Sequence, residues 1–197
     1  MIEVCQQNIF SKIRQFCASI PWQPVFNYFI FIFHKDIFGK KYQVKLPRLN
    51  FPDYNFTLNA DNSEGEGAKI FDIIRKKFVQ LSPEEWVRQH ALHYLVKDRG
   101  FPPSLIAVEK TVKINRMDKR FDILAYTASA SPLLLGECKS PYVNIDQKVF
   151  DQASRYNIVL NAPYFLITNG LVTVWAKVNR ENMAFEYLES IPRYEDL

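Results

Sequence analysis

The stretch R-F-D-I-L-A-Y-T-A-S-A-S-P-L-L-L-G-E-C-K, residues 120–139, decides the fold. Two apolar runs are separated by a short polar turn, which predicts two neighbouring strands, Arg120–Tyr126 and Leu133–Lys139. The second run is apolar on both faces, so we expect a central strand that is covered on both sides. Because strand side chains alternate between faces, Glu137 and Lys139 must point the same way.

Three charged side chains therefore gather at one end of an apolar sheet: Asp122, Glu137 and Lys139. Charges in such a place are costly without partners. A salt bridge between Lys139 and one acid is the simpler interpretation of E-x-K alone. A divalent cation held by both carboxylates and the backbone carbonyl of Cys138 is the other, because Mg²⁺ prefers oxygen ligands. We expect Mg²⁺, with Mn²⁺ as a substitute, and hydrolysis of a phosphodiester, in which Lys139 positions the attacking water or neutralises the transition state.

A helix is predicted on each side of these strands. Ser82-Pro83-Glu84-Glu85 predicts a helix start, with Ser82 as N-cap and Glu85 completing a capping box. Glu85 is also a candidate third acid for the metal, although its capping role already accounts for it. A second helix, from about Ile145 to Leu160, carries Gln152 and Tyr156 on one face, where they either look into the site or pack in the helix core.

The remaining elements complete an α/β (α+β) pattern. A strand precedes Arg120, and further strands follow the second helix, with Asn169-Gly170 as a hairpin signal. The predicted order is helix, three-strand meander, helix and strand pair, which indicates a mixed sheet flanked by helices. These further strands are expected at Lys69–Ile74, Lys77–Val79, Leu105–Ile114, Tyr164–Thr168, Val172–Val178 and Ala184–Leu188.

The composition of the 197 residues suits one globular domain, and a net charge of +4 says little about partners. The charges are clustered, however: residues 35–48 and 110–120 each hold five basic residues against one acid. Such clusters either neutralise phosphates or are ordinary solvated segments. Three cysteines without metal-ligand spacing indicate a reducing cytoplasm rather than a disulfide framework.

Residues 1–45 differ from residues 46–197 and are interpreted as a hydrophobic, aromatic extension of unknown role. Its most apolar run, Val25–Phe33, is about half the length that a membrane helix needs. No membrane association is therefore expected. Residues 46–56, with two prolines and alternating aromatics, predict an extended arm. His90 and His93 lack further nitrogen or sulfur ligands, so we expect core or surface roles for them rather than zinc binding.

Six short motifs together resemble one known family. They are P-E-E-W-V-R-Q-H (83–90), S-L-I-A-V-E-K (104–110), R-F-D-I-L-A-Y (120–126), G-E-C-K-S-P (136–141), F-D-Q-A-S-R-Y-N (150–157) and L-I-T-N-G (166–170). From about Leu46 onward the chain resembles the N-terminal nuclease domain of type I restriction enzyme R (HsdR) subunits, in a short stand-alone form. The resemblance implies a PD-(D/E)xK, restriction-endonuclease-like core and magnesium-dependent DNA cleavage.

Residue by residue, the resemblance puts Asp122, Glu137 and Lys139 on the metal and catalytic positions. It puts Gln152 and Tyr156 on a Q-x-x-x-Y motif. The family's full-length subunits carry a translocase after the nuclease, whereas this sequence ends at Leu197. The implied partners are therefore DNA and other restriction-modification or translocase subunits. A non-catalytic nucleic-acid-binding or assembly module with the same fold is the alternative, and a nuclease acting on RNA is a third possibility.

Overall fold

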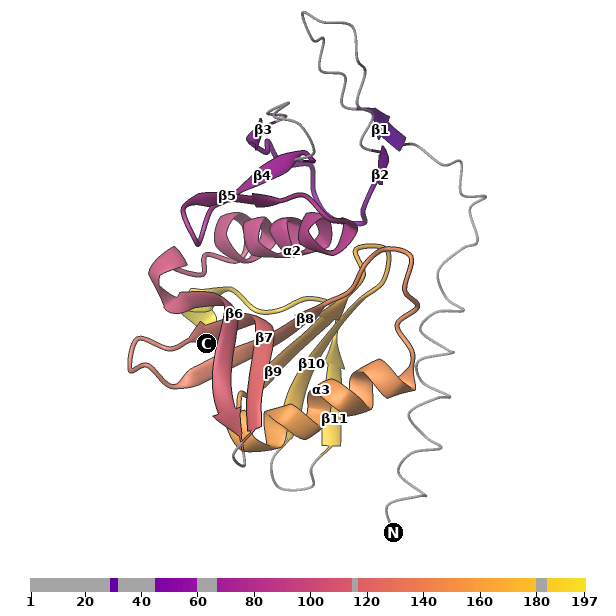
Figure 1. The fold of residues 1–197 in the computed structure, drawn as a ribbon. Coiled ribbons are helices and arrows are strands. Elements are labelled where there is room, and N and C mark those ends of the chain that lie inside the picture. The colour runs from indigo at the N-terminus through magenta and orange to yellow at the C-terminus, as the bar shows by residue number, and fades with distance from the viewer. Residues whose placement is uncertain (1–28, 32–44, 60–66, 115–116, 180–183) are drawn as a thin grey trace, which may run out of the picture.

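A six-stranded mixed sheet forms the centre of the protein, seen in a computed structural model (Figure 1). The structure describes residues 29–31, 45–59, 67–114, 117–179 and 184–197. The strand order is β11-β10-β9-β8-β7-β6, with β8 and β9 parallel and the other neighbours antiparallel. Its strands are β6 (Ile106–Ile114), β7 (Met117–Tyr126), β8 (Pro132–Cys138), β9 (Tyr164–Thr168), β10 (Thr173–Asn179) and β11 (Ala184–Leu188).

Helices cover both faces of this sheet. Helix α2 (Pro83–His93), continued by the π-helical turn Tyr94–Asp98, packs on one face, and α3 (Gln147–Leu160) packs on the other. Consecutive residues of β8 show the two sides: Leu134 is buried in the cluster with α2, and Leu135 in the cluster with α3. The predicted α+β class, with a mixed sheet flanked by helices and a two-sided central strand, is confirmed.

A second, three-stranded antiparallel sheet lies on the outer side of α2 (Figure 1). It consists of β3 (Leu58–Asn59), β4 (Lys69–Asp72) and β5 (Lys77–Gln80). Helix α2 is thus enclosed between two sheets, which explains why every residue from Glu85 to His93 is buried. Two further strands, β1 (Phe29–Phe31) and β2 (Lys45–Pro47), pair with each other.

The segment after β2 runs without regular structure, as the predicted arm requires, and closes over the β9–β10 turn. Leu49 is buried there, and the Asn50 backbone N–H donates to the Gly170 carbonyl at 2.6 Å. A Cβ on Gly170 would lie 2.7 Å from a Leu49 methyl group, and the residue has φ +81°. Glycine is therefore required at this turn both for its conformation and for the space it leaves.

The structure corrects two local predictions, the start of β7 and the capping box at Glu85. The strand expected from Arg120 begins three residues earlier, since β7 starts at Met117, which pairs with Ile114. Ser82 does cap α2, accepting from the Glu85 N–H at 3.0 Å. The Glu85 carboxylate does not complete the capping box, since it pairs with arginines instead. Helix α3 agrees with the helix predicted from about Ile145 to Leu160: it runs from Gln147 to Leu160, after Asp146 as N-cap.

Several sequence features fall outside the described residues. They include Cys5, Cys17, most of Val25–Phe33 and most of the basic cluster at 35–48. Within the described residues, no helix combines the length and the apolar character that crossing a membrane demands.

Candidate active site

Neighbouring strands bring the two predicted carboxylates together. Ile123 of β7 pairs with Gly136 of β8, so the next step of the same register sets Asp122 across from Glu137. The Cys138 N–H donates to Asp122 Oδ2 at 2.7 Å, which fixes that carboxylate against β8. Directly opposed like charges are unfavourable in a sheet, so this pair needs cations close by.

Lys139 supplies the first of these cations. It lies one residue beyond β8, and its Nζ donates to Glu137 Oε1 at 2.5 Å, as expected for side chains on the same face. The Lys139 backbone N–H donates to the Thr168 carbonyl of β9 at 2.8 Å, which holds the chain in register beyond the strand end. Both side chains keep 20–25% of their surface exposed, so the pair is open to solvent.

Arg88 of α2 supplies the second cation, and the sequence analysis did not identify it. Its guanidinium is almost fully buried, and Nη2 contacts Asp122 Oδ1 at 2.9 Å and Glu84 Oε1 at 3.1 Å. Its Nη1 donates to Glu85. The spacings Glu84–Arg88 and Glu85–Arg88 are i,i+4 and i,i+3, so these pairs were readable from the sequence. The Arg88–Asp122 contact, which joins helix and sheet, was not.

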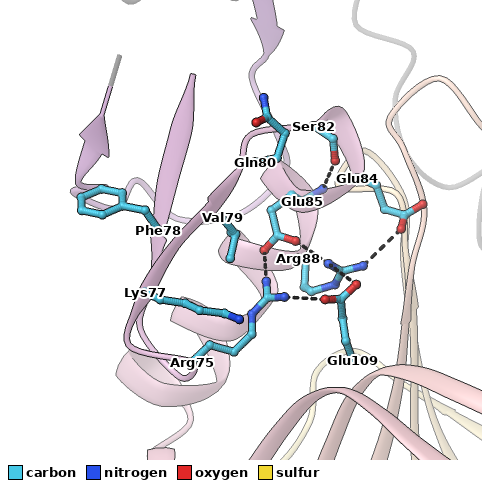
Figure 2. A pocket seen from close by; sticks show the side chains of 10 residues that line it. All are labelled: Arg75, Lys77, Phe78, Val79, Gln80, Ser82, Glu84, Glu85, Arg88 and Glu109. Atoms are coloured by element: carbon cyan, nitrogen blue, oxygen red, sulfur yellow. Dashed lines mark hydrogen bonds and ion pairs between the residues drawn. The ribbon is translucent and has the colours of Figure 1, made fainter. Parts of the chain in front are cut away.

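Arg75 extends the ion pairs into an open hollow beside the helix start (Figure 2). It follows β4 and contacts Asp72 at 2.6 Å, Glu85 at 2.8 Å and Glu109 of β6 at 2.5 Å. Glu109 has a left-handed backbone, with φ +50°, and the β6–β7 register sets it across from Asp122. Figure 2 shows Arg75 and Arg88 side by side between Glu85 and Glu109.

Glu85 therefore lies within this ion-pair cluster rather than beside Glu137. Its Oε1 accepts from Arg75 and from Gln89 at 2.8 Å each, and its Oε2 accepts from Arg88. Glu84, half-exposed, shares the Arg88 Nη2 with Asp122 and acts electrostatically on Glu137. Of the two glutamates of P-E-E-W, Glu84 is thus the one that faces the catalytic candidates. A metal-ligand role for Glu85 stays a prediction.

The charges perturb one another's protonation. Burial raises the pKa of Glu137, the Asp122 charge raises it further, and Lys139 opposes both. Burial alone would lower the pKa of Lys139, but its hydrogen bond to Glu137 and the charges of Glu137 and Asp122 raise it overall. Lys139 therefore stays protonated, and it lies beside the Glu137 carboxyl group, whose pKa is raised. Burial likewise raises the pKa of the Cys138 thiol, which makes it a packing group rather than a nucleophile.

The acidic side chains at this end of the sheet are oxygen donors, the kind of ligand that a hard divalent cation prefers. Among the described residues, the ion pairs at this end of the sheet join six carboxylates to four basic groups, so the acids in this cluster outnumber the bases by two. The acids are Asp72, Glu84, Glu85, Glu109, Asp122 and Glu137, and the bases are Arg75, Arg88, Arg120 and Lys139. Among the described residues no three acidic, histidine or cysteine side chains converge as ready-made ligands, so backbone carbonyl and water would complete an oxygen shell.

The other predicted site residues have mixed outcomes. Gln152 and Tyr156 lie on α3, but their side chains are outside the described part of the structure, so their roles stay predictions. The expected core role of His90 and His93 is confirmed, since both rings are buried and pack against Phe56 at 4.6 and 4.7 Å between centroids.

The order of helix, antiparallel meander, helix and parallel strand defines a mixed α+β domain with acids and a lysine at the ends of its central strands. The chain belongs to the family of type I restriction enzyme R protein N termini, whose model matches residues 83–192.

A solved structure described as a fragment of an HsdR subunit of a type I restriction enzyme from Vibrio vulnificus is similar to part of the chain. The sequences are 20% identical, the TM-score is 0.46, and the match covers 59% of this chain and 24% of that one. No curated protein matches the sequence.

Proposed function

We propose that this domain is a Mg²⁺-dependent DNA endonuclease of the restriction-modification type. The observation that carries the proposal is the juxtaposition of Asp122, Glu137 and Lys139 at the end of the central strands, in an ion-pair cluster of the described residues in which acids outnumber bases by two. Membership of the R protein family supports a restriction-related role. Mn²⁺ is expected to replace Mg²⁺, and the cytoplasm is the proposed location, because the substrate is intracellular DNA.

Asp122, Glu137 and the Cys138 carbonyl are the proposed ligands. A bound Mg²⁺ would supply an activated water and neutralise charge on the phosphate. Lys139 orients that water or neutralises the transition state from the Glu137 side, since its Nζ already lies at the Glu137 carboxylate. Gln152 and Tyr156 of α3 are the proposed additional contacts to phosphate or water.

Substrate binding is proposed to involve the β6–β7 hairpin. Lys110, Lys113 and Arg120 are exposed on these two strands, and Arg120 lies two residues before Asp122. Cations in this position neutralise backbone phosphates next to the cleavage site and give a salt-dependent affinity without sequence preference. Targeting along DNA is then left to partner subunits, with a translocase or other restriction-modification proteins as the proposed class.

The test is cleavage of plasmid DNA by the full chain with Mg²⁺, Mn²⁺ or Ca²⁺, comparing wild type with Asp122→Ala and Lys139→Ala. Both variants should lose at least about 10²-fold in rate, as when a transition-state donor is removed. Lys177→Ala, which removes an exposed lysine of β10, is the matched control and should cleave normally. Ca²⁺ should bind without supporting turnover.

Cleavage by Lys139→Ala at the wild-type rate would refute the assignment. Absence of Mg²⁺ and Mn²⁺ binding in calorimetry would instead favour a non-catalytic nucleic-acid-binding module. Parallel reactions with duplex DNA, single-stranded DNA and RNA decide the substrate class.

A further inference from the structure

A buried arginine connects the first helix to the proposed metal ligand. We propose that Arg88 is a positioning residue, which fixes the Asp122 carboxylate in the orientation that a bound divalent cation requires. This inference rests on the proposed function and adds to it a residue that does not itself touch metal or substrate. Its basis is the hydrogen-bond geometry around Asp122 and the way in which Arg88 is itself held.

The Asp122 carboxylate accepts hydrogen bonds from two directions. Arg88 Nη2 donates to Oδ1 at 2.9 Å from the helix, and the Cys138 N–H donates to Oδ2 at 2.7 Å from the neighbouring strand. The two contacts together prevent the carboxylate from rotating. Each carboxylate oxygen has two acceptor positions, so one position on each oxygen stays available to a cation. The two hydrogen bonds therefore orient the Asp122 carboxylate and still leave acceptor positions with which it can bind a cation.

Arg88 is rigid because its own partners are fixed. Its side chain is 4% exposed, and besides Asp122 it contacts Glu84, Glu85 and, at 3.8 Å, Glu109. Glu85 is also bound by Arg75 and by Gln89. A guanidinium can make these divergent contacts at once, whereas an ammonium on a flexible stem cannot reproduce their planar geometry.

The surrounding backbone shows a strained residue at the same place. Glu109, across from Asp122, has φ +50° and is held by Arg75 at 2.5 Å. A left-handed backbone is energetically costly at a residue other than glycine. The Arg75–Glu109 ion pair offsets that cost, so Arg75 maintains the strand while Arg88 contacts the ligand. Both arginines contact Glu85 and Glu109, but only Arg88 contacts Asp122, which makes Arg75 the control.

The experiment uses the full chain and compares wild type with Arg88→Lys and Arg75→Lys. Each variant keeps the positive charge and loses one guanidinium from the same ion-pair cluster. Three quantities are measured: the Mn²⁺ dissociation constant by calorimetry without DNA, the hydrogen-exchange rate of the Cys138 amide, and the rate of plasmid cleavage. The amide reports on the Asp122 carboxylate directly, because Asp122 is its acceptor.

For Arg88→Lys we expect Mn²⁺ binding weaker by about 10-fold or more and cleavage slower by about 10–100-fold, the usual range for residues that orient metal ligands. Exchange of the Cys138 amide should accelerate as the carboxylate becomes free to rotate. For Arg75→Lys all three quantities should stay within about threefold of wild type, although its urea midpoint falls. Wild-type Mn²⁺ binding and Cys138 exchange in Arg88→Lys would overturn the inference. Equal losses in both variants would also overturn it, because they would indicate a structural role only.

A double variant keeps the test decisive if Arg88→Lys does not fold. Glu85→Gln/Arg88→Gln removes both charges of the buried pair and retains neutral hydrogen-bonding side chains, which is milder than leaving one charge alone. Compared with Glu85→Gln, it should show the same loss of Mn²⁺ affinity, and an unchanged affinity would refute the positioning role. Failure of wild type to cleave with any divalent cation refutes the proposed function instead, so the two outcomes are distinguishable.

Discussion

Acidification should destabilise the fold through buried imidazoles, because burial lowers the pKa of both His90 and His93, and His90 can be tested by itself. Burial lowers its pKa from 6.5 to about 4, because the ring is enclosed by Trp86 and Phe56 at centroid distances of 4.3 and 4.6 Å. Its Nδ1 lies 2.9 Å from the Trp86 carbonyl, which assigns the proton of the neutral ring to Nδ1. The folded protein therefore resists a second proton that the unfolded chain accepts.

The direction and the size of the stability change follow from the pKa of His90 in the unfolded chain, 6.5, and in the folded protein, about 4. Above pH 6.5 neither state is protonated at His90, and stability is unaffected. As the pH falls below 6.5 the unfolded chain binds the proton and the folded chain does not, so stability is lost until the pH reaches about 4. The loss is about 2 kcal/mol between pH 7 and pH 5, and about 3 kcal/mol once both states are protonated.

Urea denaturation followed by tryptophan fluorescence at pH 7, 6 and 5 measures this effect, with His90→Leu as the comparison. The variant should lose about 2 kcal/mol less than wild type over this range, whatever its stability at pH 7. Carboxylates titrate in both proteins and cancel in the difference. Parallel loss of stability in wild type and variant would refute the assignment of the effect to His90.

Two further substitutions at buried positions should destabilise the domain far more than a substitution at an exposed position. Gly136→Ala would place a Cβ 3.0 Å from the Ile123 Cβ, so we expect about 1–3 kcal/mol of destabilisation in urea and slower cleavage, because the crowded strand carries the proposed metal ligand. Asp72→Ala should cost about 3–5 kcal/mol, since this fully buried carboxylate binds the backbone and side chain of Arg75. Its control, Asp53→Ala, removes an acid whose side chain is 83% exposed and should change the stability by less than about 0.5 kcal/mol. Equal losses of stability in Asp72→Ala and Asp53→Ala would refute the importance assigned to the buried carboxylate.

The local part of the site was predictable because strand geometry is periodic. Alternation put Glu137 and Lys139 on one face, and the structure places Lys139 Nζ at the Glu137 carboxylate. The two apolar runs around a polar turn correctly indicated adjacent strands, which brought Asp122 beside them. The strands β9 and β11 were predicted with the bounds that the structure gives.

The contacts between elements were not predictable, since no short-range pattern encodes them. Arg88 reaches Asp122, and Arg75 reaches Glu109, each across 34 residues of sequence. The same contacts explain why the capping-box prediction for Glu85 was wrong. The buried Arg88 and the partly exposed Arg75 compete for its carboxylate and outweigh a single hydrogen bond to a backbone N–H at a helix end.

The arm that closes over the Gly170 turn limits how far the protein can be truncated from its N-terminal side. The family match begins at residue 83, yet Leu46, Leu49, Ile70 and Leu81 are buried in the same cluster as α2. The Trp86 indole N–H also donates to the Pro47 carbonyl at 3.1 Å. A fragment trimmed to the family limits would leave that indole unpaired and the glycine turn uncovered. The segment that matches the family is thus shorter than the folding unit, and a shortened version that folds should begin no later than Lys45.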